Sequence, residues 1–489
     1  MLNDIFDDNS TNFINKIGGS TITPEISITA KSNIAIKSNI AKIPITLPSY
    51  SPATINIPTI SYDAIFNNID ISDKKIDIDN LLNLSIDIDY PKFSLGFHHY
   101  LHASKGDIKT KILKQFDGKK KVYLIMNDFE VEIDNYDKSI SNELKTFLNI
   151  THDLDNDFYN FWELLFMFDI IDINQENLTS IHLTEGYGGL MYATTLFKDT
   201  YSKKSKSKSN NDLYYYNKQL HNDILKHTFD LNKNILNYYN QNKIKNLIML
   251  DNKTKTPEYN SIDLITSDIS LEWIDDDNAR EHNMYELLIN EIDYILKYQI
   301  KGGNFVCKIF ESYNLTTTKI ITILSSLYNK VFIVKPLSSN FMNTEKYIIC
   351  LDFKLSTKSN DYKNITKIFD ILVNKLKKNN LNLNIVDLMP NYKISSVIIA
   401  HITQINRDVG YRQFKTFNSA VQFVQEQNYY GDVYKTHRDI QIDATKFWLD
   451  IFLADPKQFK EHKTKAQELS FITNKINVDK SVKMNKILD

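Results

Sequence analysis

Two charged residues in the middle of the chain lie where strands are expected to end. Lys308 is near the far end of an apolar segment that starts at Phe305, and the glycine pair Gly302-Gly303 comes before it. Glu345 comes at the start of a later apolar segment. The carboxyl ends of strands line the ligand crevice of an open α/β sheet, so both side chains are expected to point into one cleft. An amine and a carboxylate placed there suit chemistry on a hydroxyl group next to a phosphodiester.

Elements of two kinds alternate between about residues 155 and 355. Apolar segments of strand length are 180–183, 245–250, 262–266, 305–310, 331–334 and 347–353. Apolar residues at helical spacing indicate a helix over 284–296, which the pair Gly302-Gly303 is expected to end. Further helices are expected to start near 191 and to cover 316–328. Strands separated by helix-length segments predict an α/β fold with a mostly parallel, doubly wound sheet.

A glycine-rich turn joins the first of these strands to the helix that follows it. The turn consists of Glu185, Gly186, Tyr187, Gly188 and Gly189. Glycine lets the backbone approach a ligand closely, although a tight structural turn would use the same residues. Combined with Asp268, Lys308 and Glu345 at later strand ends, the turn indicates a specific ligand site.

With these motifs in this order, residues 155 to 355 resemble the FtsJ-like ribose 2′-O-methyltransferases. The similarity is greatest to the mRNA cap 2′-O-methyltransferases of large cytoplasmic DNA viruses. The resemblance implies a Rossmann-like domain with S-adenosylmethionine as its cofactor. The residues that the resemblance places at the cofactor are Glu185, Gly186, Tyr187, Gly188, Gly189, Asp251 and Asp268. The family usually has proline where this chain has Tyr187, and phenylalanine or tryptophan where it has Leu190.

The resemblance also implies catalytic residues. The family has a Lys-Asp-Lys-Glu tetrad, and the residues that match its last three members are Asp268, Lys308 and Glu345. Asn160 stands where the first lysine is expected, and the chain has no lysine between Lys145 and Lys198. Either Lys145 or a lysine from 105–121 supplies that amine, or the site lacks one member. The stretch 335–339 resembles the substrate-side loop of the family.

The implied reaction is transfer of a methyl group to a ribose 2′-hydroxyl, which is a weak nucleophile at neutral pH. Lys308, as a cation or as an amine with a lowered pKa, is expected to help remove the hydroxyl proton and to stabilise the alkoxide. Asp268 and Glu345 would orient Lys308 and set its charge state. Much of the rate would come from positioning the reacting groups, and no metal is needed.

Three functions are compatible with these residues. The first is methylation of capped mRNA in the host cytoplasm or the virion, with other viral capping or transcription proteins as further candidate partners. The second is a catalytically degenerate methyltransferase-fold protein that serves as an RNA-binding or assembly subunit, as the missing lysine and the flanking regions suggest. The third is an rRNA 2′-O-methyltransferase, against which the flanking regions argue because bacterial members are compact.

The composition, 42% hydrophobic and 24% charged, is that of a soluble globular protein. The net charge is −2, so contact with a nucleic acid requires a local basic patch. Three regions are expected: a low-complexity N-terminal arm over 1–84, the methyltransferase domain over 85–360 and a mostly helical region over 361–489. A basic, serine-rich insertion near 199–212 is either solvated or in contact with phosphates.

Cysteine content and apolar runs bear on location. Cys307 and Cys350, the two cysteines of the sequence, lie in apolar segments and are expected to be free thiols in a reducing compartment. The acidic start, 1–8, lacks the basic region of a signal peptide. No run approaches the ~18 apolar residues that a membrane span needs. These features predict an intracellular protein that does not cross a membrane.

Overall fold

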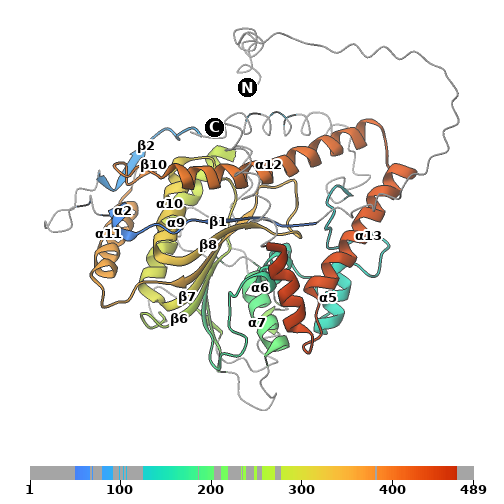
Figure 1. The fold of residues 1–489 in the computed structure, drawn as a ribbon, viewed down its shortest axis with the longest axis horizontal. Helices are drawn as coiled ribbons and strands as arrows, with labels where there is room; N and C mark the ends of the chain where they lie inside the picture. The colour runs from blue at the N-terminus through green and yellow to red at the C-terminus, as the bar shows by residue number, and fades with distance from the viewer. Residues whose placement is uncertain are drawn as a thin grey trace, which may run out of the picture. The chain divides into compact units, whose positions relative to one another are not determined.

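The central sheet has the strand order β1-β8-β9-β7-β6-β3-β4-β5 (Figure 1). This computed structural model describes residues 50–66, 69, 80–91, 99, 103, 106, 125–184, 187–202, 211–217, 233, 235–237, 247–250, 256–269, 277–379 and 383–470. The strands are β1 (Ala53–Ile57), β3 (Thr179–Leu183), β4 (Leu213–Tyr216), β5 (Leu247–Met249), β6 (Ile262–Ser267), β7 (Gln299–Ile309), β8 (Tyr328–Lys335) and β9 (Lys346–Phe353). Strands β3 to β7 are parallel to one another, whereas β9 is antiparallel to β7 and β8, and β1 is antiparallel to β8. The prediction of a mostly parallel α/β sheet is confirmed.

Helices cover both faces of this sheet. They are α2 (Tyr62–Phe66), α5 (Ile140–Leu148), α6 (Asn156–Met167), α7 (Gly189–Tyr201), α9 (Asp277–Tyr298), α10 (Leu315–Leu327), α11 (Asn360–Lys377), α12 (Ser396–Gln425) and α13 (Asp432–Phe452). In Figure 1, α9 and α10 lie on one side of the sheet, and α6 and α7 lie on the other. A second, small sheet pairs β2 (Leu82–Ser85) with β10 (Asn384–Leu388).

Each face of the sheet belongs to its own hydrophobic cluster. Leu264 and Ile265 are neighbours in β6, yet Ile265 packs in a cluster with α9, α10 and α11, and Leu264 packs in a cluster with α6, α7 and α13. The cause is that successive side chains of a strand point to opposite faces. Because both faces are buried, the strands are apolar along most of their length, which is why they could be recognised in the sequence.

The prediction that the pair Gly302-Gly303 ends a helix is wrong. Strand β7 begins directly after α9 and contains both glycines, at a point where its register with β6 shifts. Gly302 has a φ of +88°, and a Cβ on Gly303 would lie 3.0 Å from the backbone oxygens of Asp263 and Ile300. A bulge and a helix end both need a residue without a Cβ, so the two glycines alone do not distinguish them.

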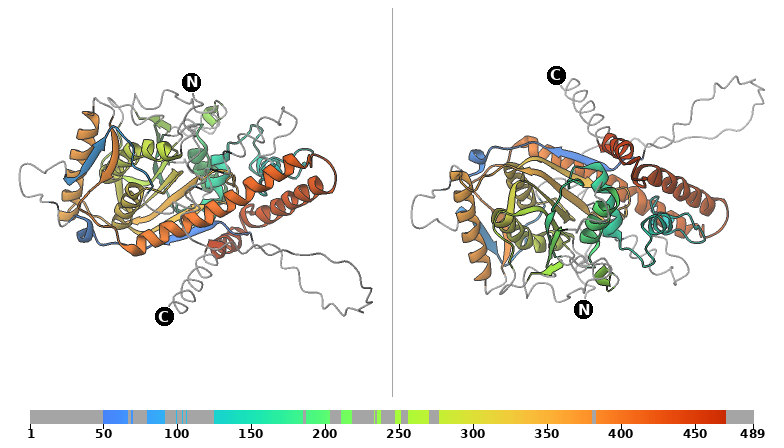
Figure 2. Two further views of the ribbon diagram at one scale, coloured as in Figure 1. Left: turned by 90° about the horizontal axis from the view of Figure 1, so that it is seen from above. Right: turned by 90° about the horizontal axis from the view of Figure 1, so that it is seen from below.

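Segments on both sides of the predicted central domain also pack on the sheet. Strand β1, from the predicted arm, is an edge strand of the sheet. Phe369 of α11 and Ile402 of α12 belong to the same cluster as Ile265, and Trp448 of α13 belongs to the other. Figure 2 shows α13 folding back after α12. The domain limits near 84 and 360 stay predictions, and residues 1–49 of the arm lie outside the described residues.

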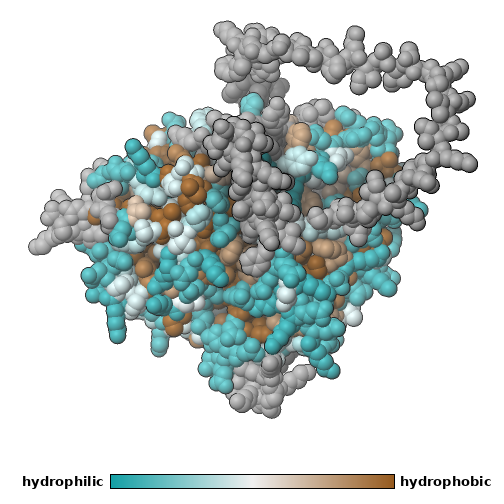
Figure 3. Space-filling model, viewed as in Figure 1, coloured by the Kyte–Doolittle hydropathy of each residue, from teal (hydrophilic) through white to brown (hydrophobic). Residues whose placement is uncertain are grey.

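The predicted insertion near 199–212 is closed at its base by an ion pair. Lys198 Nζ lies 2.5 Å from Asp212 Oδ1, and both side chains are buried. Residues 203–210, between them, lie outside the described residues. Cys307 and Cys350 are both buried and free. The surface drawn in Figure 3 is mainly hydrophilic, and none of the helices in the described ranges is long and apolar enough to cross a membrane.

Candidate active site

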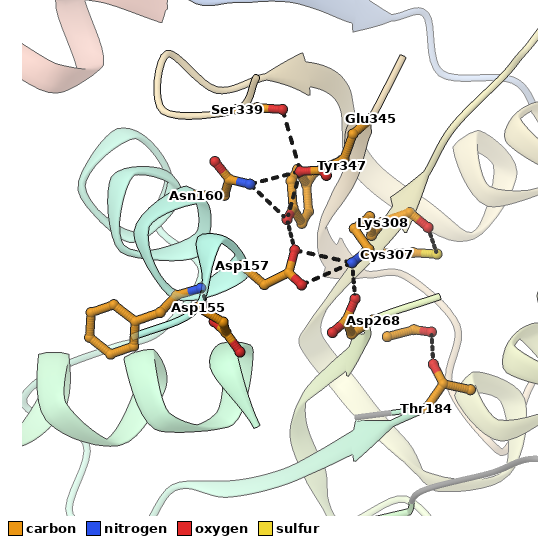
Figure 4. Close-up of polar contacts among 12 residues, drawn as sticks. Asp155, Asp157, Asn160, Thr184, Asp268, Cys307, Lys308, Ser339, Glu345 and Tyr347 are labelled. Atoms are coloured by element: carbon orange, nitrogen blue, oxygen red, sulfur yellow. Dashed lines mark hydrogen bonds and ion pairs between the residues drawn. The ribbon is translucent and has the colours of Figure 1, made fainter. Parts of the chain in front are cut away.

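Lys308 lies at the centre of a buried charged cluster at the carboxyl ends of β6 and β7 (Figure 4). Its Nζ forms an ion pair with Asp268, which directly follows β6. The same Nζ lies 3.0 Å from both carboxylate oxygens of Asp157, in the first turn of α6. The backbone N–H of Asp268 also donates to the carbonyl of Leu183, at the end of β3, at 3.1 Å. One amine is therefore held between two carboxylates from different elements.

Glu345 is connected to Lys308 through other side chains. Asn160 Nδ2 donates to Glu345 Oε1 at 2.7 Å, and the hydroxyl of Tyr347 donates to Asp157 Oδ1 at 3.0 Å (Figure 4). Asn160 Nδ2 is also 3.4 Å from the hydroxyl of Tyr347. The structure thus brings Asp268 and Lys308 into direct contact and places Glu345 in the same cluster, one side chain further away.

The cluster contains more carboxylates than cations. Burial acts to lower the pKa of Lys308, but the carboxylates of Asp157, Asp268 and Glu345 outweigh it and raise that pKa well above its ordinary value. Lys308 is therefore a fixed cation and not an amine with a lowered pKa. Burial, followed by the charge of Asp157, raises the pKa of Asp268 to about 7, and the same two causes raise the pKa of Glu345. At Asp268 the charge of Lys308 opposes burial and the charges of Asp157 and Asp155 but does not outweigh them, so the Asp268 carboxyl can take up a proton near neutral pH.

A second buried network supports the end of β3. Thr184, with a φ of +50°, begins the glycine turn, and its hydroxyl lies 3.1 Å from that of Ser267. Ser267 donates to Glu291 of α9, and Cys307 Sγ lies 3.3 Å from Glu291 Oε2. Burial raises the pKa of Glu291 to about 7. This network fixes the strand ends that carry Asp268 and Lys308, which are the next residues after Ser267 and Cys307.

The described part of the glycine turn serves the packing of α6 against α7. Gly188 precedes α7 with a φ of +99°, in the left-handed region that favours glycine. A Cβ on Gly189 would overlap the carboxyl group of Asp155, at 2.8 Å from its Cγ. Asp155 in turn caps α6 by accepting from the backbone N–H of Phe158 at 2.8 Å. The glycines therefore allow the two helix starts to approach each other closely.

A cavity of about 220 Å³ lies beside this turn. Its walls are formed by Asp153, Leu154, Asp155, Phe158, Tyr187, Gly189, Tyr192 and Ile235. The aromatic walls suit an apolar or flat group, and the two carboxylates suit a positively charged one. Of the other residues predicted at the cofactor, Glu185, Gly186 and Asp251 lie outside the described residues.

Comparison with known proteins assigns the fold to a family. Residues 168–353 match the family model of the FtsJ-like methyltransferases. Residues 168–353 therefore have the fold of the FtsJ-like methyltransferases. The resemblance inferred from the sequence is confirmed, and α6 lies just before the matched residues.

Curated proteins similar to this chain include viral and cellular ones. An uncharacterized protein of Acanthamoeba polyphaga mimivirus is 25% identical over 62% of this chain and 67% of that protein. The cap-specific mRNA (nucleoside-2′-O-)-methyltransferase 1 of Dictyostelium discoideum is 28% identical over 31% of this chain and 19% of that protein. The cap-specific mRNA (nucleoside-2′-O-)-methyltransferase of Autographa californica nuclear polyhedrosis virus is 30% identical over 22% of this chain and 40% of that protein. The matches to the two methyltransferases thus cover less than half of each of them.

In this FtsJ-like domain, two polar residues of the cluster were missed in the sequence. Asp157 lies one helical turn before Asn160, so both face the same side of α6, and this i, i+3 spacing was an available signal. Tyr347 is two residues after Glu345, so strand alternation puts both on one face. Lys145, one candidate for the missing amine, instead lies 2.9 Å from Asp153. Helix α6 has no lysine, and its Asn160 side chain faces Glu345. The lysines of the other candidate segment, 105–121, all lie outside the described residues.

Proposed function

We propose that this chain transfers a methyl group from S-adenosylmethionine to a ribose 2′-hydroxyl of RNA, at the cap-proximal nucleotide of a viral mRNA. The observation that carries the proposal is the fixed Lys308 cation between Asp157 and Asp268, at the strand ends of an FtsJ-like domain. The proposed setting is the cytoplasm of an infected host cell, together with other viral capping or transcription proteins. The net charge of −2 means that RNA would be held by local contacts.

The residues beside the glycine turn fit the proposed cofactor. S-adenosylmethionine, when bound, supplies an electrophilic methyl group on a positively charged sulfur. Tyr187, Gly188 and Gly189 would hold it by close backbone approach, as would Glu185 and Gly186 of the same turn. Asp155, partly buried in the wall of the cavity, adds a carboxyl group that suits a cation. We also assign Asp268 and Asp251 to the cofactor side of the site, as the resemblance implies.

The proposed chemistry divides the work between a cation and a base. The Lys308 ammonium stabilises the negative charge that develops on the 2′-oxygen. The carboxylate of Asp268, with a pKa raised to about 7, accepts the hydroxyl proton at and above neutral pH. Asp157 and Glu345 hold Lys308 charged, because both carboxylates raise its pKa.

One observation favours a second function. Asn160, a neutral amide, bonds Glu345 at the position where the family resemblance places a lysine. Without that lysine, Lys308 faces the carboxylates of Asp157, Asp268 and Glu345, although Lys335 also acts on Glu345. This excess of carboxylates weakens the field that would stabilise an alkoxide. The alternative is a catalytically degenerate methyltransferase-fold protein that binds RNA or serves as an assembly subunit.

Methyl transfer by the purified full chain separates the two functions. Labelled S-adenosylmethionine is mixed with RNA that is capped or uncapped, and cofactor binding is measured by calorimetry. We expect transfer to capped RNA and its loss in Lys308→Met. The control Lys319→Met removes another buried lysine, which lies on α10 and pairs with Asp387, and should keep the activity. Cofactor binding without transfer would favour the degenerate protein, and neither binding nor transfer would refute the proposed enzyme.

A further inference from the structure

The loop between β8 and β9, residues 336–344, leads directly into Glu345 and is contacted by helix α12. Gln413 Nε2 donates to the carbonyl of Met342 at 2.8 Å, and the Gln413 side chain is fully buried. The neighbouring Arg412 guanidinium lies 5.9 Å from the centre of the Phe341 ring. Helix α12 lies beyond the residues that match the FtsJ-like family, which end at 353. A segment outside the match thus contacts the middle of this loop.

The start of the same loop is held by Glu163, which joins α6 to α13. The Glu163 carboxylate accepts from the backbone N–H groups of Leu337 and Ser338, at 2.6 and 3.1 Å, and from the Ser338 hydroxyl at 3.0 Å. Its fourth donor is the indole N–H of Trp448, at 3.1 Å. Glu163 and Trp448 are both fully buried. Burial raises the pKa of Glu163 to about 7, and the four hydrogen bonds oppose that rise.

Two short paths connect these anchors to the charged cluster. The Ser338 hydroxyl also lies 2.9 Å from Asn160 Oδ1, so its single proton is shared between Asn160 and Glu163, and Asn160 donates to Glu345. At the other side, Lys335 Nζ donates to the Ser339 hydroxyl at 3.0 Å and to the backbone oxygen of Glu345 at 3.1 Å. A displacement of the loop would therefore move Glu345 itself.

We propose that α12 and α13 form a positioning element of the methyl-transfer site, in which Gln413 and Trp448 fix loop 336–344. The inference rests on the proposed function, since it assigns these helices a role in placing Glu345 for that reaction. Neither side chain touches the cluster, so both act through the loop. A shift of about 1 Å in a positioned group can lower a rate by about a hundredfold, so modest loosening of the loop is expected to lower kcat.

The chain offers a matched pair of tryptophans for the test. Trp448→Phe removes the indole N–H that reaches Glu163 and keeps an aromatic ring in place. Trp162→Phe removes a second buried indole N–H between α6 and α13, which donates to the carbonyl of Phe452 at 2.8 Å and not to the loop. Similar losses of stability are expected in both variants. We expect hydrogen exchange in the 336–344 peptide to increase, and kcat to fall about tenfold with unchanged cofactor affinity, in Trp448→Phe only.

A second variant covers the case in which Trp448→Phe fails to fold. Gln413→Met keeps the length of the side chain, and the Gln413 Oε1 that it removes has no hydrogen-bond partner among the described residues. The variant should fold with little change in stability, yet exchange faster in the 336–344 peptide. In addition, Trp448→Phe should have little further effect on exchange or kcat in a Glu163→Met background, which removes the acceptor through which Trp448 acts.

The exchange measurement does not require activity, so the two proposals can fail separately. An inactive wild-type chain with the expected exchange pattern would refute the proposed enzyme and keep the loop anchoring. An active wild-type chain in which Trp448→Phe and Trp162→Phe behave alike, and Gln413→Met leaves the loop unchanged, would overturn the inference.

Discussion

Replacing Asp157 by asparagine tests the charge balance of the cluster. Asp157 contacts Lys308 with both carboxylate oxygens at 3.0 Å, and its charge is the second cause, after burial, of the raised pKa of Asp268. The asparagine side chain would keep one oxygen for Lys308 but remove the negative charge. The pKa of Asp268 should then fall from about 7, and the pKa of Lys308 should fall as well.

The size of the shift follows from the geometry. Asp157 and Asp268 both contact one ammonium, so their charges lie within about 6 Å of each other. At an effective dielectric constant of about 20, two unit charges at about 6 Å interact by about 3 kcal/mol, or roughly two pKa units. Lys308 lies between them and reduces this repulsion, so a downward shift of about one unit is expected for Asp268.

The assay is kcat for methyl transfer between about pH 5 and about pH 9 at constant ionic strength. A carboxylate that accepts the hydroxyl proton works only when ionised, so activity rises with pH through the pKa of Asp268. Asp157→Asn should therefore move the acid limb of the profile to lower pH. The control is Asp169→Asn, which removes a largely exposed carboxylate that pairs with Lys463 just after α6. An acid limb that stays in place, or that moves to higher pH, would refute Asp268 as the base.

Three other predictions follow from the same contacts. Gly189→Ala should lower stability by about 1–3 kcal/mol and weaken cofactor binding, because its Cβ would overlap the Asp155 carboxyl group. The control Gly106→Ala, which has open space around its Cβ, should change neither quantity. Thermal melts measure the stability, and calorimetry measures the cofactor binding. Glu291 has a pKa raised from 4.5 to about 7, so its contribution to stability is present below pH 4.5 and is lost as pH rises through about 7; Glu291→Gln should flatten the fall in melting temperature over that range. Asn160→Lys should raise kcat for capped RNA, because it supplies the cation that the site lacks, and should lower stability, because the position is buried. An unchanged kcat would show that the absence of this cation does not limit the reaction.

The order of elements could be predicted from the sequence because strands buried on both faces are apolar throughout. Asp268 and Lys308 were found for a related reason, since each lies at the end of such a strand. Asp157 was not found, because it contacts Lys308 across 151 positions of sequence and lies on a helix without a distinctive motif. The pair Gly302-Gly303 was assigned to a helix end because the same conformational freedom serves a bulge. The roles of the helices after 360 could not be predicted, because they depend on single hydrogen bonds such as that of Gln413.

The asparagine at position 160 and the charge of the cluster belong to one physical question. A lysine at position 160 would face Glu345 and lie one turn from Asp157, where it would neutralise one of the carboxylates that now surround Lys308. With asparagine there, the cluster keeps an excess of negative charge, which raises the pKa of Asp268 and Glu345. A buried anionic cluster binds cations better than neutral molecules. If the site is an active one, it should therefore hold the positively charged S-adenosylmethionine more tightly than its demethylated product, which lacks the sulfonium charge, and that preference should grow as pH rises through about 7. Equal affinity for S-adenosylmethionine and its demethylated product at every pH would mean that the carboxylates stabilise the packing of α6 and β9 and do not contribute to cofactor binding.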